Sequence, residues 1–127
     1  MVLKMKIDLV KKLVTRIFKK HGLESKHALV CAKALINAEL VGAPSHGLAR
    51  MSSYCNRIKK KVINPKPKIK IKRISSSITS INADNAVGFI GANLGINYAI
   101  RNAKKTGIGF VAVKNSGHYG LSGYYAE

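Results

Sequence analysis

Two short polar segments of this sequence carry side chains that can do acid–base chemistry. The first, GAPSHGLAR (residues 42–50), contains Ser45, His46 and Arg50. The second, KNSGHYG, contains His118 between Gly117 and Gly120. An imidazole that titrates near neutral pH can exchange a proton with a substrate hydroxyl, and a guanidinium can hold a carboxylate through a forked pair of hydrogen bonds. These residue types are therefore the minimum set for chemistry on a hydroxy acid.

Each segment also has an ordinary structural interpretation. A serine such as Ser45 can cap the helix that follows while His46 points to solvent, and a loop histidine often makes a single hydrogen bond. Arg50 lies four residues after His46, a spacing that places both side chains on one face of a helix. We therefore expect His46 and Arg50 to meet one small anion. His118 follows an apolar run, and loops held by a rigid strand often carry function.

Three helices are predicted around the first segment. Apolar residues recur at helical spacing over residues 8–22, and a second helix is predicted over residues 25–42 with Ser25 as its N-cap. A third helix is predicted over residues 48–61, before Pro65 forces extended backbone.

The hydrophobic period changes in the second half of the chain. KIKIKRI and SSITSINA have apolar residues two apart, which predicts two short strands, and ADNAVG predicts a turn. A helix is predicted over residues 89–105, and IGFVAV is an apolar run typical of a buried strand. The fold class is therefore mixed α/β. N-terminal helices form a segment over residues 1–62, and residues 63–127 begin an α/β domain with short strands, a helix and a buried strand.

The composition limits the classes of function. The chain has 127 residues and 46% hydrophobic content, which favours one folded domain with a core. Lys and Arg number 23 against 5 Asp and Glu, a formal net charge of +18, so a noncatalytic basic domain that binds nucleic acid or another polyanion is the alternative to an enzyme. The densest basic stretch, RIKKKVINPKPKIKIKR, has no aromatic residue for base stacking, which favours a solvated basic surface.

The cysteines and the termini give no sign of metal binding, secretion or a membrane. Cys31 and Cys55 form neither a C-x-x-C pair nor a cluster with histidine, so no disulfide framework and no metal site is indicated. No segment has the unbroken apolar length of a membrane span, and the N-terminus does not resemble a secretory signal. We expect a cytoplasmic protein.

One apparent cofactor motif is a coincidence. GIGFVA (residues 107–112) fits G-x-G-x-x-A, the dinucleotide fingerprint. That fingerprint needs a strand before the glycines and a helix after them, so that the pyrophosphate meets the helix N-terminus. Here the predicted order is reversed, and the segment carries no cofactor prediction.

Taken in order, these segments resemble the malate/L-lactate dehydrogenase family, whose members bind a nicotinamide cofactor without a Rossmann fold. The similarity runs from about residue 8 to the end and includes AELVGAPSHGLAR, INPKPKIKI and the D-N-x-x-G turn followed by N-S-G-H-Y-G. The resemblance implies an oxidoreductase that transfers a hydride between NAD or NADP and a small 2-hydroxy or 2-keto acid. It also implies a homodimer as the active form.

The family assigns roles to four residues of this chain. Ser45 and His46 match a Ser–His pair that works with an aspartate further along the chain, and Arg50 matches the arginine that binds the substrate carboxylate. His118 matches a second histidine, which is the acid/base in some members. Which histidine moves the proton stays open, and the resemblance assigns no cofactor-binding residue here.

The sequence departs from the family in places. The family often has aspartate where Glu39 stands and a basic residue near Val41, and the glycine that usually precedes I-N-P is replaced by Lys61 and Val62. Family members are more than twice as long as this chain, and the absent part carries the relay aspartate and most of the cofactor site. We expect an N-terminal fragment that is inactive alone.

The enzyme hypothesis makes a geometric prediction. His46 and His118 must come together although they lie far apart in the sequence. We expect both imidazoles and the Arg50 guanidinium to surround a cleft of small-acid size, within about 10 Å of one another, because proton transfer needs hydrogen-bond reach.

The charge predicts only nonspecific binding to DNA. Affinity for duplex DNA should be independent of sequence and should fall by about 10³-fold or more between 50 and 200 mM salt, since binding releases condensed counterions. Fluorescence anisotropy with two duplexes of unrelated sequence tests this. Selective binding of one duplex that survives physiological salt would instead support the nucleic-acid alternative.

Overall fold

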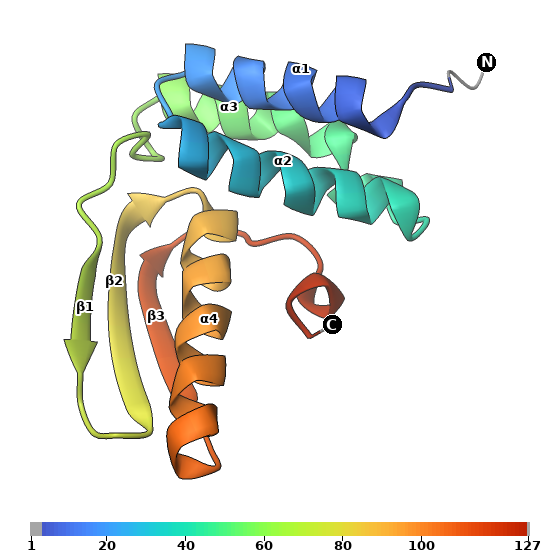
Figure 1. Cartoon of the computed structure of the whole chain (residues 1–127). Coiled ribbons are helices and arrows are strands. Elements are labelled where there is room, and N and C mark those ends of the chain that lie inside the picture. The colour runs from blue at the N-terminus through green and yellow to red at the C-terminus, as the bar shows by residue number, and fades with distance from the viewer. Residues whose placement is uncertain (1–3, 127) are drawn as a thin grey trace.

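The computed structural model describes residues 4–126 and places a layer of helices across one end of a small sheet (Figure 1). A further helix lies along one face of that sheet. The helices are α1 (Ile7–Lys20), α2 (Ser25–Leu40), α3 (Met51–Lys59) and α4 (Gly88–Thr106), and the strands are β1 (Lys70–Arg73), β2 (Ile78–Ala86) and β3 (Phe110–Ser116). This arrangement is the mixed α/β class that the sequence predicts.

The helical layer and the sheet share one hydrophobic core. Helix α1 buries Val14 and Phe18 against α2, whose buried side includes Cys31 and Leu35. The same cluster contains Phe89 at the start of α4. Burying one such large apolar side chain stabilises the fold by about 1.5–3 kcal/mol. The core therefore fixes the helices relative to α4, while the division after residue 62 stays a prediction.

Two predicted helix starts are wrong. Glu24, not Ser25, is the N-cap of α2; its backbone is extended and its side chain makes no capping hydrogen bond. The third helix begins at Met51 rather than at residue 48, because residues 44–50 form two short 3₁₀ turns.

The sheet has the order β1–β2–β3, with β1 antiparallel and β3 parallel to β2. Helix α4 connects β2 to β3 and covers one face of both strands. Gly91 and Gly95 allow close packing, since a Cβ on either would lie within 3.2 Å of a Val113 methyl group. Their spacing of four residues places both on one face of α4.

The predicted turn at ADNAVG is a bulge within β2. The strand continues to Ala86, but Asp84 and Asn85 adopt left-handed backbone with φ of 52° and 57°. The Asp84 carboxylate accepts hydrogen bonds from the Asn64 amide and the Lys68 backbone N–H, at 2.9 and 2.8 Å. Aspartate and asparagine tolerate left-handed backbone, so both are turn residues as predicted. The predicted end of the strand is wrong, because β2 continues through the turn to Ala86.

Strand β3 is not the buried strand that its apolar run predicts. Val111 and Val113 are half-buried on the side of α4, whereas Phe110 is 61% exposed. The reason is that β3 is an edge strand within residues 4–126 and only one of its faces is covered. The strand still carries the chain to His118 as expected.

A substitution at Gly88 tests how tightly α4 holds the loop after β3. A Cβ at Gly88 would overlap the carbonyl oxygens of Gly117 and His118, so Gly88→Ala should lower the free energy of unfolding by about 1–3 kcal/mol. Urea denaturation measures the change. Gly123→Ala is the matched control, because a Cβ there meets no atom within 4 Å. Equal effects of the two substitutions would contradict this packing.

Candidate functional site

The turn that carries His46 and Arg50 is not the start of one helix. Pro44–His46 and Leu48–Arg50 are separate 3₁₀ turns, and between them Gly47 has φ −96° and ψ −139°. The prediction that His46 and Arg50 share a helical face is therefore wrong. Arg50 instead folds back across the turn, and its Nε donates a hydrogen bond to the Ser45 carbonyl oxygen at 2.9 Å.

Glu39 at the end of α2 sets the shape of this turn. Its Oε1 accepts a hydrogen bond from the Leu48 backbone N–H at 2.7 Å. Gly47 is buried directly beneath, and a Cβ at that position would overlap the Glu39 carboxylate. Glu39, which stands where the family often has aspartate, therefore supports the turn.

Ser45 and His46 form a pair within the turn. The Ser45 hydroxyl and His46 Nδ1 are 3.1 Å apart, and the ring tautomer decides which of them donates. The structure shows no capping hydrogen bond from Ser45 to the turn or helix that follows. The ordinary interpretation of Ser45 as a helix cap is therefore wrong.

His118 is held from two sides at the exit of β3. Its Nδ1 lies 3.0 Å from the Tyr54 hydroxyl and 3.3 Å from the Gly120 backbone nitrogen. A backbone N–H can only donate, so Nδ1 is an acceptor, and in the neutral ring Nε2 carries the proton. The protein thereby selects one tautomer of His118.

The two histidines lie together, as the enzyme hypothesis predicts. Their ring centroids are 5.9 Å apart and the ring planes are inclined by 30°. The pKa of His118 lies below its usual value, chiefly because partial burial disfavours the charged form and then because of the positive charge of Arg50. Both effects favour the neutral form of the ring. The small-acid cleft that we expect between these groups stays a prediction.

Tyr54 is the residue that sequence reasoning missed. It is buried, packs against Phe89 at a ring-centroid distance of 5.1 Å, and turns its hydroxyl to His118. Burial also raises the pKa of Tyr54, so it is a neutral hydrogen-bonding group. Its position four residues after Arg50, on the same predicted helix, was the signal that could have revealed it.

A second feature lies beside the His118 loop. Gly88, Ala92, Ser116, Gly117 and Tyr119 help to line a hollow of about 350 Å³ at the N-terminal end of α4. Val111 and Val113 also line it, so its walls combine small and apolar residues with the hydroxyl groups of Ser116 and Tyr119, and none of its lining residues is acidic. Such a lining suits a small apolar or aromatic group.

Residues 4–126 contain neither a metal cluster nor a membrane-spanning helix. No group of three or more His, Cys, Asp or Glu residues in that part of the chain is arranged to hold a metal ion. No helix in the same range is both long enough and apolar enough to cross a bilayer.

Comparison with known proteins identifies the family. The family model described as malate/L-lactate dehydrogenase matches residues 5–127. The chain belongs to this family. Its relatives are named dehydrogenases, so the family is one of oxidoreductases.

Individual relatives agree with this assignment. The chain is 38% identical over 117 residues to the L-sulfolactate dehydrogenase of Methanocaldococcus jannaschii, covering 92% of this chain and 34% of that protein. It is 42% identical over 113 residues to the malate dehydrogenase of Pyrococcus abyssi, covering 89% and 31%. The structure of the malate dehydrogenase from Pyrococcus horikoshii OT3 superposes with a TM-score of 0.93 at 35% identity, covering 98% of this chain and 36% of that one. The chain thus spans about a third of the relatives that it matches.

Arg50 should control the titration of His118. Replacing Arg50 with Gln should raise the pKa of His118 toward its usual value, because a nearby positive charge that opposes protonation is removed. Nitrogen-15 NMR of the imidazole measures this pKa. Arg57→Gln is the matched control and should have a smaller effect, since Arg57 contributes less to the lowered pKa. A larger effect from Arg57, or none from Arg50, would place Arg50 away from the ring.

Proposed function

We propose that this site belongs to an NAD- or NADP-dependent dehydrogenase that interconverts a small 2-hydroxy acid and its 2-keto acid. The observation that carries the proposal is the 5.9 Å approach of the His46 and His118 rings, with Arg50 close enough to lower the pKa of His118. Two imidazoles and a guanidinium at one place suit a substrate that carries a hydroxyl and a carboxylate on neighbouring carbons.

The hydrogen bonds give the two histidines different roles in this proposal. His118 carries its proton on Nε2, so it can donate a hydrogen bond to the substrate oxygen but cannot accept a proton there. His46 can hold the proton on Nδ1 by donating to Ser45, which leaves Nε2 with a free lone pair. We therefore assign the proton acceptor to His46 and the polarising donor to His118.

The proposed oxidation removes one proton and one hydride from the substrate. In oxidation, the hydroxyl proton passes to His46 Nε2, the carbon–hydrogen bond breaks, and the carbonyl double bond forms while His118 donates to the oxygen. The nicotinamide, when bound, takes up the hydride. Arg50 holds the carboxylate and so fixes the distance from the reacting carbon to both rings. Reduction is the reverse of these steps.

The hollow beside the His118 loop is the proposed place for part of the cofactor. Gly117 has no side chain to block a ligand, and Ser116 and Tyr119 offer hydroxyl groups. The first backbone N–H groups of α4 have no side-chain cap, which suits an anionic or polar group.

The complete enzyme is proposed to be a cytoplasmic homodimer. Cys31 and Cys55 are buried free thiols, which suits a reducing compartment. The homodimer is proposed from the family resemblance.

A chimera tests the proposed activity and the role of Arg50. Residues 5–127 would replace the matching segment of the P. horikoshii malate dehydrogenase. We expect the chimera to reduce oxaloacetate with NADH or NADPH, measured by loss of absorbance at the nicotinamide band. Arg50→Lys keeps the charge and loses the forked pair of hydrogen bonds. We therefore expect kcat/KM to fall roughly 10- to 150-fold, which corresponds to a loss of about 1.5–3 kcal/mol of transition-state stabilisation.

Arg57→Lys in the same chimera is the control. It makes the same exchange within α3 and should leave kcat/KM within about twofold, because lysine keeps the positive charge that acts on His118 and Arg57 is not proposed to contact the substrate. A folded chimera that lacks all activity contradicts the proposed function. An active chimera in which Arg50→Lys has no effect removes Arg50 from the substrate site alone.

A further inference from the structure

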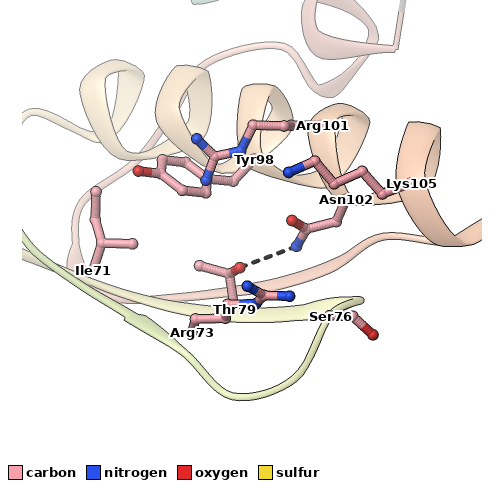
Figure 2. Close-up of a pocket in the computed structure, with 8 residues that line it drawn as sticks. All are labelled: Ile71, Arg73, Ser76, Thr79, Tyr98, Arg101, Asn102 and Lys105. Carbon is pink, nitrogen blue, oxygen red and sulfur yellow. Dashed lines mark hydrogen bonds between the residues drawn. The ribbon is translucent and has the colours of Figure 1, made fainter.

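A separate basic hollow lies at the other end of α4, away from the histidines. It occupies about 280 Å³ between the C-terminal half of α4 and the β1–β2 hairpin (Figure 2). Arg73 comes from β1, and Arg101 and Lys105 come from successive turns of α4. Nothing in the dehydrogenase site requires three cations at this place.

The three positive charges have no acidic partner at the hollow. None of its lining residues is Asp or Glu, and among residues 4–126 the salt bridge that forms is between Lys11 and Asp8 on α1. Arg101 and Lys105 are four residues apart on one helix face, where like charges destabilise a helix by a few tenths of a kcal/mol. An anion between them would turn this repulsion into attraction.

Two of the cations are already oriented. The Arg101 guanidinium carbon lies 4.0 Å from the centroid of the Tyr98 ring, a cation–π contact, and Figure 2 shows the two side chains lying together over the hollow. Arg73 Nε donates to the Ser75 carbonyl oxygen at 3.2 Å. Both contacts leave the terminal guanidinium nitrogens free to bind a ligand, and orientation in advance lowers the entropy cost of binding.

The floor of the hollow is a buried polar pair. Thr79 is 2% exposed, and its hydroxyl oxygen accepts a hydrogen bond from the Asn102 amide at 3.0 Å (Figure 2). Asn102 also lies 3.4 Å from the Ser77 carbonyl oxygen. The amide thus uses its donors within the protein, and the Thr79 hydroxyl hydrogen remains available as a donor toward the hollow.

We propose that this hollow binds a phosphate group, either as the free ion or as a small phosphate monoester. A dianion with several oxygens can use the fork of each arginine together with the lysine ammonium and the threonine hydroxyl. A single carboxylate would leave most of these donors and two of the charges without a partner. The half-buried Tyr98 ring closes one side and limits the ligand to a small one.

Titration of the 127-residue chain with inorganic phosphate tests the proposal. The measurement is by amide NMR at constant ionic strength, with sodium chloride replaced by phosphate as it is added. We expect saturable shifts at Arg73, Thr79 and Arg101. Arg101→Gln should raise the dissociation constant about tenfold or more, as expected for loss of a charge-assisted hydrogen bond.

Lys104→Gln is the matched control, because it removes the same charge from the neighbouring residue of α4, which does not line the hollow. It should change the dissociation constant less than about twofold, since an exposed charge outside the site is screened. Arg73→Gln provides a second test variant if Arg101→Gln does not fold.

Three results would overturn the proposal. The first is the lack of saturable shifts at these residues. The second is an equal loss of phosphate affinity in Lys104→Gln, which would indicate that the diffuse field of the +18 charge attracts the ion. The third is displacement of phosphate by a short DNA duplex through the same residues, which would make the hollow part of a nucleic-acid surface. A small phosphate monoester that binds more tightly than the free ion would support the proposal and identify the source of the group.

Discussion

The hydrogen bond between the Tyr54 hydroxyl and His118 joins two halves of the chain that are distant in sequence. Tyr54 is buried in the helical layer, and His118 lies in the loop that follows β3. The 3.0 Å contact between them therefore fixes this loop against α3. Phe89 packs on the Tyr54 ring, and Gly88 lets the loop backbone approach α4. Without this contact the ring nitrogen Nδ1 of His118 would keep only the hydrogen bond from the Gly120 backbone N–H of its own loop, and the ring would be less constrained relative to His46.

The other half of the site depends on Glu39. Its carboxylate bonds to the backbone of Leu48 above Gly47 and thereby positions the turn that carries His46 and Arg50. Neither Tyr54 nor Glu39 is proposed to touch substrate. Both act by placing a ring or a guanidinium, so the chemistry depends on packing between elements rather than on a single loop.

Sequence patterns predicted most of the elements and the pairing of the two histidines, but they could not supply the local geometry. Hydrophobic period locates α1, α2 and α4, because it reports which face is buried. It cannot show that Gly47 breaks the chain into two turns, since that break depends on the Glu39 side chain from another helix. The exposure of Phe110 could not be predicted from the sequence either, because an apolar run of strand length is compatible with a strand covered on one face or on both.

The central claim is that the turn at His46 and the loop at His118 form one site in the folded chain. The most direct measurement is the nuclear Overhauser effect between the ring protons of the two imidazoles in the 127-residue chain. Ring centroids 5.9 Å apart predict cross-peaks between the His46 and His118 rings, together with cross-peaks from His118 to the Tyr54 ring. A folded chain with dispersed amide resonances and assigned ring protons, but with no cross-peak between the two histidines, would contradict the claim.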